Sequence, residues 1–244
     1  MRTANPALSA GTFSRVAGTA GERAMSVQGT VNKTAVLLLL VVISSAWIWN
    51  QAWAGAPVQG WMLAGLIGGL ITGIVTVFKQ RWAPVTAPVY ALLEGLALGG
   101  ISAAFERAYP GIVIQAVTLT FGTLTALLLA YTSRLISVTQ NFRLGVAAAT
   151  GGILLVYLAS FVLSFFGVRM SFLYDSSPLS IGISLFVVVI ASLNLVLDFD
   201  FIEHAAERRL PAYMEWYAGF GLLVTLVWLY IEILRLLAKL RSRR

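Results

Sequence analysis

Residues Thr34–Phe78 read TAVLLLLVVISSAWIWNQAWAGAPVQGWMLAGLIGGLITGIVTVF and contain no Asp, Glu, Lys or Arg. A charged group at the centre of a bilayer costs about 2.5–3.5 kcal/mol on the insertion scale, so long uncharged windows mark membrane spans. This window is too long for one span of about 20 residues, and Ala54-Gly55-Ala56-Pro57 interrupts it. It therefore predicts two membrane helices, at residues 34–53 and 59–78.

The same alternation of apolar windows and charged breaks continues to the end of the chain. The further predicted spans are residues 86–105, 111–132, 144–166, 179–199 and 212–238. Most are close to the about 20 residues that cross a hydrocarbon core of about 30 Å at 1.5 Å per residue. We therefore expect an all-α membrane protein, with a bundle of seven transmembrane helices at residues 34–241. Residues 1–33 are expected to form a mobile cytoplasmic tail, because they offer little apolar surface to bury.

The composition of the chain agrees with a membrane protein and excludes several other classes. Of its 244 residues, 59% are hydrophobic and only 11% are charged, against about 25% charged in soluble domains. There is no cysteine and the only histidine is His204, so disulfide frameworks and multi-histidine metal sites are excluded. The net charge of +7 is not taken as a sign of a nucleic-acid partner. Most basic residues lie outside the apolar windows, where they are explained by the orientation of the protein in the membrane.

The distribution of Lys and Arg predicts the orientation in the membrane. If the amino terminus is cytoplasmic, the outer loops contain only Arg107 and Arg169. The inner segments then contain Arg2, Arg15, Arg23, Lys33, Lys79, Arg81, Arg134, Arg143, Arg208 and Arg209. This asymmetry follows the positive-inside rule and predicts a multi-pass protein of the plasma membrane. The basic carboxyl terminus disagrees, since seven spans place it outside; the alternative is a re-entrant last helix that returns it inside.

Acidic residues within the apolar windows are the candidates for function, because intramembrane acids commonly mark ion or proton pathways. Glu94 lies inside the third predicted span, far from both of its ends. Asp198 and Asp200 end the sixth span, Glu215 lies in the first turn of the seventh, and Glu232 lies near its end. We expect these five acids to form an ion pathway or a pH-sensitive latch.

Most of these acids also have a structural interpretation. Glu232 and Arg235 are i,i+3 neighbours near an interface, where an ion pair is the simpler expectation. Glu215 is near a helix start, where the helix dipole stabilises a negative charge. Asp200 and Glu203 could be solvated at the membrane edge. Glu94 has no such explanation and requires a partner, a proton or water.

Asp198 is placed about one helical turn inside the cytoplasmic edge of its span. If it faced a second acid, the two could share a proton and form a latch that responds to pH. The deprotonated pair could attract calcium, because carboxylate oxygens are the ligands that calcium prefers. Asn194 is on the same helical face, four residues earlier. His204, near the cytoplasmic surface, could tune the proton balance.

Two further observations bear on packing and on chemistry. Gly65 and Gly69, and likewise Gly95 and Gly99, have the GxxxG spacing that lets membrane helices approach closely. The sequence has no Ser-His-Asp or Cys-His set, no HExxH, no P-loop and no dinucleotide-binding fingerprint. We therefore expect a protein that is not an enzyme and holds no resident cofactor.

Three segments, taken in order and spacing, resemble the Bax inhibitor-1 family, also called the transmembrane BAX inhibitor motif family. They are Glu94-Gly-Leu-Ala-Leu-Gly in the third span, Leu197-Asp-Phe-Asp-Phe-Ile at the end of the sixth, and Leu229-Tyr-Ile-Glu-Ile-Leu-Arg-Leu-Leu in the seventh. The resemblance extends from about Lys33 to Arg241 and is greatest to the bacterial branch with a long amino-terminal tail, which implies the bacterial inner membrane.

The resemblance implies a central seventh helix and a pH-sensitive calcium leak. It also implies that Asp198 takes part in a closing latch. The family's partner aspartate falls near Thr225, which is not acidic, so the two-aspartate latch is not reproduced. A further acid of the family's second helix is also missing here. Glu94, Glu215 or Asp200 could substitute.

The leading hypothesis is thus an ion-conducting membrane protein, a proton-gated leak for calcium, with Ca²⁺ or H⁺ as permeant ion. The alternative is a non-conducting regulator or scaffold that binds a membrane protease or a stress-response factor. The sequence identifies no particular protein partner. A proton-coupled transporter is the third option, but no inverted repeat supports it.

Overall fold

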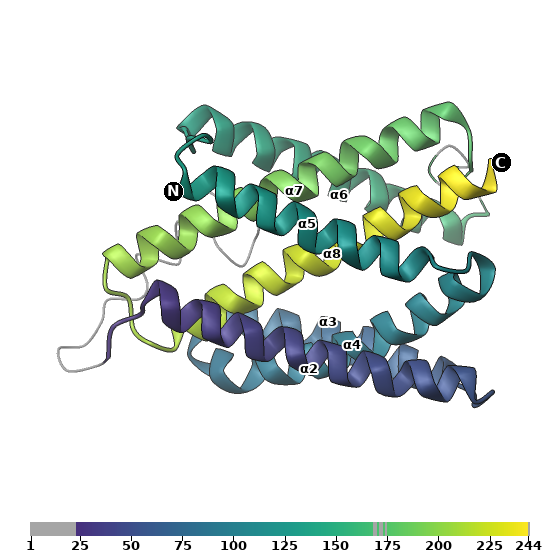
Figure 1. Ribbon diagram of the computed structural model, residues 1–244, viewed down its shortest axis with the longest axis horizontal. Helices are drawn as coiled ribbons and strands as arrows, with labels where there is room; N and C mark the ends of the chain where they lie inside the picture. The colour runs from purple at the N-terminus through teal and green to yellow at the C-terminus, as the bar shows by residue number, and fades with distance from the viewer. Residues whose placement is uncertain (1–22, 168–169, 171–172, 174, 244) are drawn as a thin grey trace.

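The structure, a computed structural model, describes residues 23–167, 170, 173 and 175–243 (Figure 1). Within this part of the chain, seven helices are long and apolar enough to cross a membrane. They are α2 (Val27–Trp53), α3 (Gln59–Phe78), α4 (Ala83–Ala108), α5 (Ile112–Thr132), α6 (Gln140–Phe165), α7 (Pro178–Glu207) and α8 (Met214–Ser242). A short 3₁₀ turn, η2 (Gln80–Trp82), precedes α4. The predicted all-α fold with seven spans is confirmed.

Helix α8 is the centre of the bundle. It packs against α7, α2, α5 and α4 and runs from one end of the molecule to the other, crossing α5 (Figure 1). Of its most apolar window 61% is buried, against 11% for α6, which packs mainly against α7. The central position predicted for the last helix is therefore confirmed. Because α8 is one continuous helix, the re-entrant alternative is not adopted.

Glycines allow α4 to lie close to both α2 and α3. A Cβ atom on Gly95 would lie 2.5 Å from the Val41 carbonyl oxygen of α2, and one on Gly65 of α3 would lie 2.5 Å from the Leu93 carbonyl oxygen of α4. Ser45 of α2 uses this proximity, since its hydroxyl donates a 2.9 Å hydrogen bond to the Gly95 carbonyl oxygen. The close helix packing predicted from the GxxxG spacing is present at these seams.

Several helices extend beyond the predicted spans. Helix α7 continues to Glu207, past the predicted end at Phe199, and α2 begins at Val27 because the Ser26 hydroxyl caps it by accepting a bond from the Gly29 amide. Charged residues mark the edge of the hydrocarbon, whereas a helix can continue into the polar layer. The last residues of the predicted tail 1–33 are therefore helical. The rest of the predicted mobile tail, residues 1–22, lies outside the described residues.

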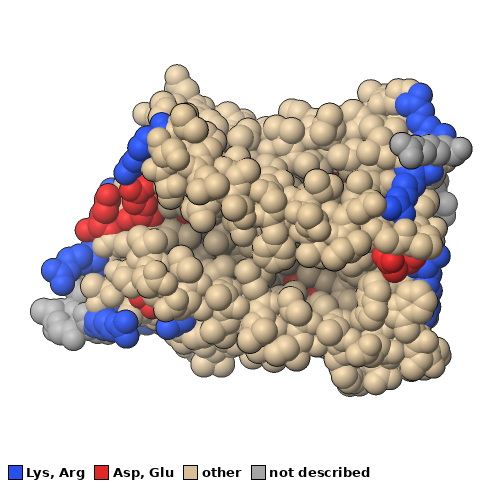
Figure 2. Space-filling model, in the orientation of Figure 1, with Lys and Arg blue, Asp and Glu red and all other residues tan. Residues whose placement is uncertain are grey.

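Charged side chains gather at the two ends of the bundle. Figure 2 shows Lys, Arg, Asp and Glu at both ends of this face, with a broad band between them that is almost free of charge. Large exposed apolar side chains such as Leu70, Leu129 and Leu155 lie in the helices between these ends. An apolar belt bounded by charge is the surface expected of a protein embedded in a bilayer.

Candidate functional site

A polar cavity lies at one end of the bundle, where α5 and α7 end and α6 begins. Its volume is about 300 Å³. It is lined by Tyr131, Arg134, Ile136, Ser137, Val138, Arg143, Asp200, Glu203, His204 and Glu207. Of the predicted site residues, only Asp200 lines this cavity, together with Glu203 and His204, which the sequence placed at the membrane edge.

Asp200 is the most engaged carboxylate of the cavity. Its Oδ2 atom lies 2.8 Å from Nη2 of Arg143 on α6, and its Oδ1 atom lies 3.5 Å from Nδ1 of His204, one turn further along α7. The side chains of Asp200 and Arg143 are 8% and 17% exposed, so this ion pair is largely removed from water. The pair joins α6 to α7, and removing either partner would leave an uncompensated charge away from water.

Glu203 makes a second connection, from α7 to the end of α5. Its Oε1 atom lies 2.9 Å from Nη2 of Arg134, and its Oε2 atom accepts a hydrogen bond from the Tyr131 hydroxyl. Arg134 lies two residues beyond the end of α5 and has a φ of 58°, in the left-handed region that often terminates a helix.

The helical period of α7 explains why these groups meet. Glu203, His204 and Glu207 lie three, four and seven positions after Asp200, which places them on one face. Asn194 fixes the same helix to α6, because its Nδ2 atom donates a 2.8 Å bond to the Thr150 hydroxyl. The polar face of α7 is thereby held over the start of α6.

Asp198 lies on another face of α7, inside the bundle. Its side chain is completely buried, with an exposed fraction of 0%, and it is not among the residues that line the polar cavity. The Thr225 side chain, where the family resemblance places a second acid, is also buried and donates to the Gly221 carbonyl oxygen at 3.3 Å. The role of Asp198 in a latch stays a prediction.

Glu215 is part of a separate cluster that anchors the start of α2. Its Oε1 atom accepts bonds of 3.0 Å from both the amide and the hydroxyl of Ser26, and Lys33 lies 3.9 Å from its Oε2 atom. A Cβ atom on Gly29 would overlap this carboxylate, so only glycine leaves room for it. Glu215 therefore stabilises the amino end of α2, where a negative charge also favours the helix dipole.

Glu232 and Glu94 occupy two further places. The Glu232 carboxylate lies 3.3 Å from Arg235 and accepts a 3.1 Å bond from the Tyr157 hydroxyl, so the expected ion pair is present. Glu94 is half-buried on α4, where its side chain lies beside that of Tyr90. A Cβ atom on Gly69 of α3 would lie 3.1 Å from the Glu94 carboxylate. The five predicted acids thus lie in several separate clusters, and their role in an ion pathway or a latch stays a prediction.

Among the residues that the structure describes, no three His, Cys, Asp or Glu side chains come together to hold a metal ion. The possible calcium contact at Asp198 stays a prediction.

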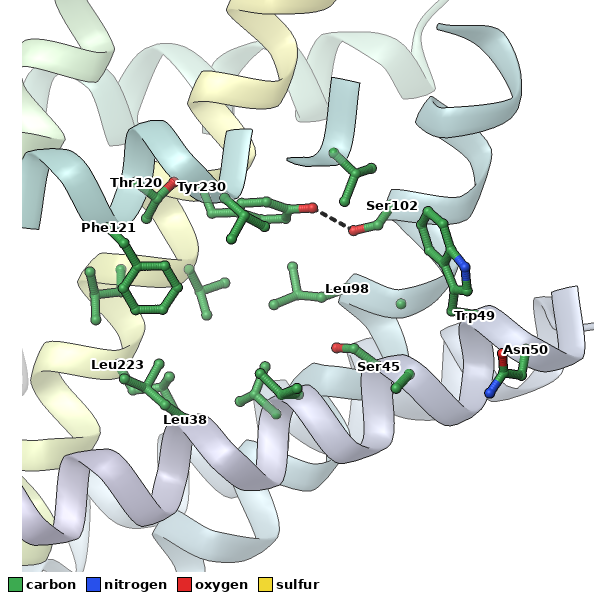
Figure 3. Close-up of a pocket in the computed structure, with 18 residues that line it drawn as sticks. Leu38, Ser45, Trp49, Asn50, Leu98, Ser102, Thr120, Phe121, Leu223 and Tyr230 are labelled. Atoms are coloured by element: carbon green, nitrogen blue, oxygen red, sulfur yellow. Dashed lines mark hydrogen bonds between the residues drawn. The ribbon is translucent and has the colours of Figure 1, made fainter. Parts of the chain in front are cut away.

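A second cavity, of about 400 Å³, is apolar and lies between α2, α4, α5 and α8. Figure 3 shows Leu98, Phe121 and Leu223 around it, with the Ser102 and Tyr230 hydroxyls hydrogen-bonded to each other at 2.7 Å. It contains no charged side chain. An ion entering it would lose its hydration without compensation, so this cavity is not a candidate for ion binding.

Sequence reasoning missed the three residues that bind the acids of the polar cavity. Tyr131 was not considered, and Arg134 and Arg143 were counted only as basic residues of the inner segments. Arg143 and Asp200 are 57 positions apart, a pairing that no local pattern reveals. The one available signal was physical: a carboxylate near the membrane edge of a buried helix requires a countercharge.

Comparisons with known proteins give one match. A family model described as Bax inhibitor 1 like matches residues 5–242, which is nearly the whole chain. No curated protein and no solved structure matches the chain.

Proposed function

The chain belongs to the Bax inhibitor 1-like family, and we propose that it is a calcium leak of the bacterial plasma membrane, gated by protons at the polar cavity. The amino terminus is cytoplasmic in this proposal, so the cavity opens on the cytoplasmic side. The observation that carries it is the pair of ionic connections that hold α7 to its neighbours: Asp200 with Arg143 and Glu203 with Arg134.

These connections define a closed state. While Asp200 is ionised, Arg143 holds α6 against α7 and neutralises the carboxylate that a cation would otherwise approach. Beyond the cavity, towards the bundle centre, α7 presents buried apolar residues such as Leu195, Val196 and Leu197. A hydrated cation cannot cross such a layer until the helices separate.

Protonation supplies the opening step. As the pH falls, Asp200 takes up a proton, loses its charge and releases Arg143. The groups that face Asp200 bear on this step: Arg143 from α6, and His204 and Glu203 on its own helix.

The test is calcium flux into liposomes that contain the purified protein and a calcium-sensitive dye. We expect flux above that of protein-free liposomes, and we expect it to rise as the cytoplasmic side is acidified. Flux that falls on acidification would contradict the gating step. Absence of flux at every pH would contradict conduction.

A non-conducting regulator is the second candidate, and the apolar layer within α7 favours it. No structural change is required if the protein only binds a partner in the membrane. Co-purification of a stoichiometric partner, together with absence of liposome flux, would support this alternative over the leak. The same pair of measurements therefore separates the two functions.

A further inference from the structure

An apolar groove runs along the outside of the bundle between α2 and α5. We call it the α2–α5 groove; its volume is about 480 Å³, and its lining includes Val31, Leu38, Leu124, Leu128, Phe199 and Leu222. Leu222 belongs to the central helix α8, so the groove reaches the centre of the bundle. Figure 2 shows the same face hollowed between these elements. The volume lies within the range of about 300–1,000 Å³ that is typical of ligand sites.

The chemistry of the groove suits hydrocarbon and disfavours water. The two threonines on its α2 side donate their hydroxyls to their own helix, Thr30 to the Ser26 carbonyl oxygen and Thr34 to the Thr30 carbonyl oxygen, both at 3.0 Å. Most of the remaining lining side chains are aliphatic or aromatic. Water in the groove would lose hydrogen bonds, whereas an acyl chain would lose none.

The length of the groove fits one leaflet. On α2 it extends from Val27 to Leu38, which corresponds to about 16 Å at 1.5 Å per residue, or about half of a 30 Å hydrocarbon core. Leu38 also lines the second apolar cavity, which continues along α2 towards its other end (Figure 3). The α2–α5 groove therefore accommodates a chain that enters from the polar-cavity side of the membrane.

A positively charged side chain lies at the entrance of the groove. Arg134 lines its outer end, and the side chain is 76% exposed, with only its Nη2 atom bound to Glu203. The planar guanidinium has five N–H donors and matches the geometry of phosphate. A phosphate at the level of this arginine would place an attached acyl chain at the mouth of the groove.

We propose that the α2–α5 groove binds one phospholipid, with an acyl chain between α2 and α5 and the headgroup phosphate at Arg134. The bound lipid touches the candidate site, because Tyr131, Glu203 and Arg134 form a wall that the groove and the polar cavity share. The phosphate competes with Glu203 for the guanidinium, and so it weakens the connection between α5 and α7.

Photo-crosslinking on the wild-type protein tests the position of the lipid. The probe is phosphatidylglycerol with a diazirine near the middle of one acyl chain, incorporated into nanodiscs that contain the full chain. We expect labelled peptides from α2 and α5, and labelling of Leu222, which lies on the central helix and is only 8% exposed. Uniform labelling of the outer faces of α3 and α6, without any label on α8, would overturn the proposal.

Lipid retention in detergent, measured by native mass spectrometry, tests the chemistry. Ala35→Trp places a large side chain in the groove and is expected to lower retained phosphatidylglycerol about tenfold, which corresponds to about 1.4 kcal/mol. Arg134→Gln removes the cation at the phosphate and should lower retention severalfold. Ala148→Trp is the matched control, an exposed alanine of α6 outside the groove, and it should retain lipid as the wild type does. Equal retention by all variants, or a co-purified protein helix in place of lipid, would overturn the proposal.

Discussion

Asp200 differs from the other predicted acids in three features. It forms an ion pair with Arg143, its carboxylate lies 3.5 Å from His204, and it lines the polar cavity. Its neighbour Asp198 is completely buried on another face of the same helix. Two acids that are two positions apart in sequence therefore occupy different environments, because successive helical residues point in different directions.

At the residue scale, Asp198 gives the first prediction. In the latch that the family resemblance implies, Asp198 contributes to the same gate as Asp200, so we expect Asp198→Asn to flatten the pH dependence of calcium flux in liposomes; the change replaces a completely buried carboxylate with a neutral side chain of similar shape. The matched control is Asp175→Asn, which neutralises an exposed acid that lies before the start of α7 and should keep the wild-type pH response. An unchanged pH profile in Asp198→Asn would remove this residue from the gating step.

Glu215 gives a second prediction, about stability. Glu215→Ala removes the acceptor of two Ser26 hydrogen bonds, and a hydrogen bond to a charged group contributes about 1.5–3 kcal/mol. We expect a lower Tm in detergent, and a similar loss for Gly29→Ala, whose Cβ atom would displace the carboxylate. The exposed acid Glu207 is the control, since Glu207→Gln should leave Tm unchanged. A wild-type Tm in both α2 variants would contradict the anchoring role.

Local spacing decided how well these residues could be predicted from the sequence. The Glu232–Arg235 ion pair was predictable, because i,i+3 neighbours share a helical face. The Asp200–Arg143 pair was not, because it depends on how α6 packs on α7. The bond between Glu215 and Ser26 joins positions that are 189 residues apart, which likewise depends on tertiary packing alone.

At the scale of the helices, existence was predicted well and boundaries were predicted poorly. All seven windows became helices, yet α7 extends to Glu207 and α6 begins at Gln140 after the Thr139 cap. Charge locates the hydrocarbon edge because ionised groups avoid lipid, but helix ends depend on capping bonds. The segment that forms the polar face of α7 lies beyond the predicted span for this reason.

The seam between α2 and α4 gives a third prediction. We expect Gly95→Ala to destabilise the protein by about 1–3 kcal/mol, because the new Cβ atom would lie 2.5 Å from the Val41 carbonyl oxygen and force the helices apart. Gly151→Ala on α6 is the control, since nothing lies within 4 Å of its added Cβ atom. Thermal unfolding in detergent measures both. Equal Tm values for the two variants would contradict close packing at this seam.

At the scale of the whole molecule, the seven helices place the two ends of the described chain on opposite sides of the membrane. Helix α2 begins at the end of the bundle with the polar cavity, and α8 ends at the other (Figure 1). The chain has no cysteine, so single cysteines report position without background. We expect a membrane-impermeant maleimide to label Ser242→Cys in intact cells and Gln80→Cys only in inverted vesicles. Labelling of both positions from the same side would contradict the topology.

The most direct test of the account is calcium flux at neutral pH for Arg143→Gln, Asp200→Asn and the double variant in liposomes. If the ion pair between these residues holds α6 to α7, each single variant at pH 7 should show the calcium flux that the wild type reaches only at acid pH. The double variant should show no further increase in flux. Arg81→Gln, in the η2 turn before α4, is the control and should keep the wild-type pH profile. The account would be contradicted if the three variants conduct at pH 7 no faster than the wild type does at pH 7, and if their flux still rises on acidification.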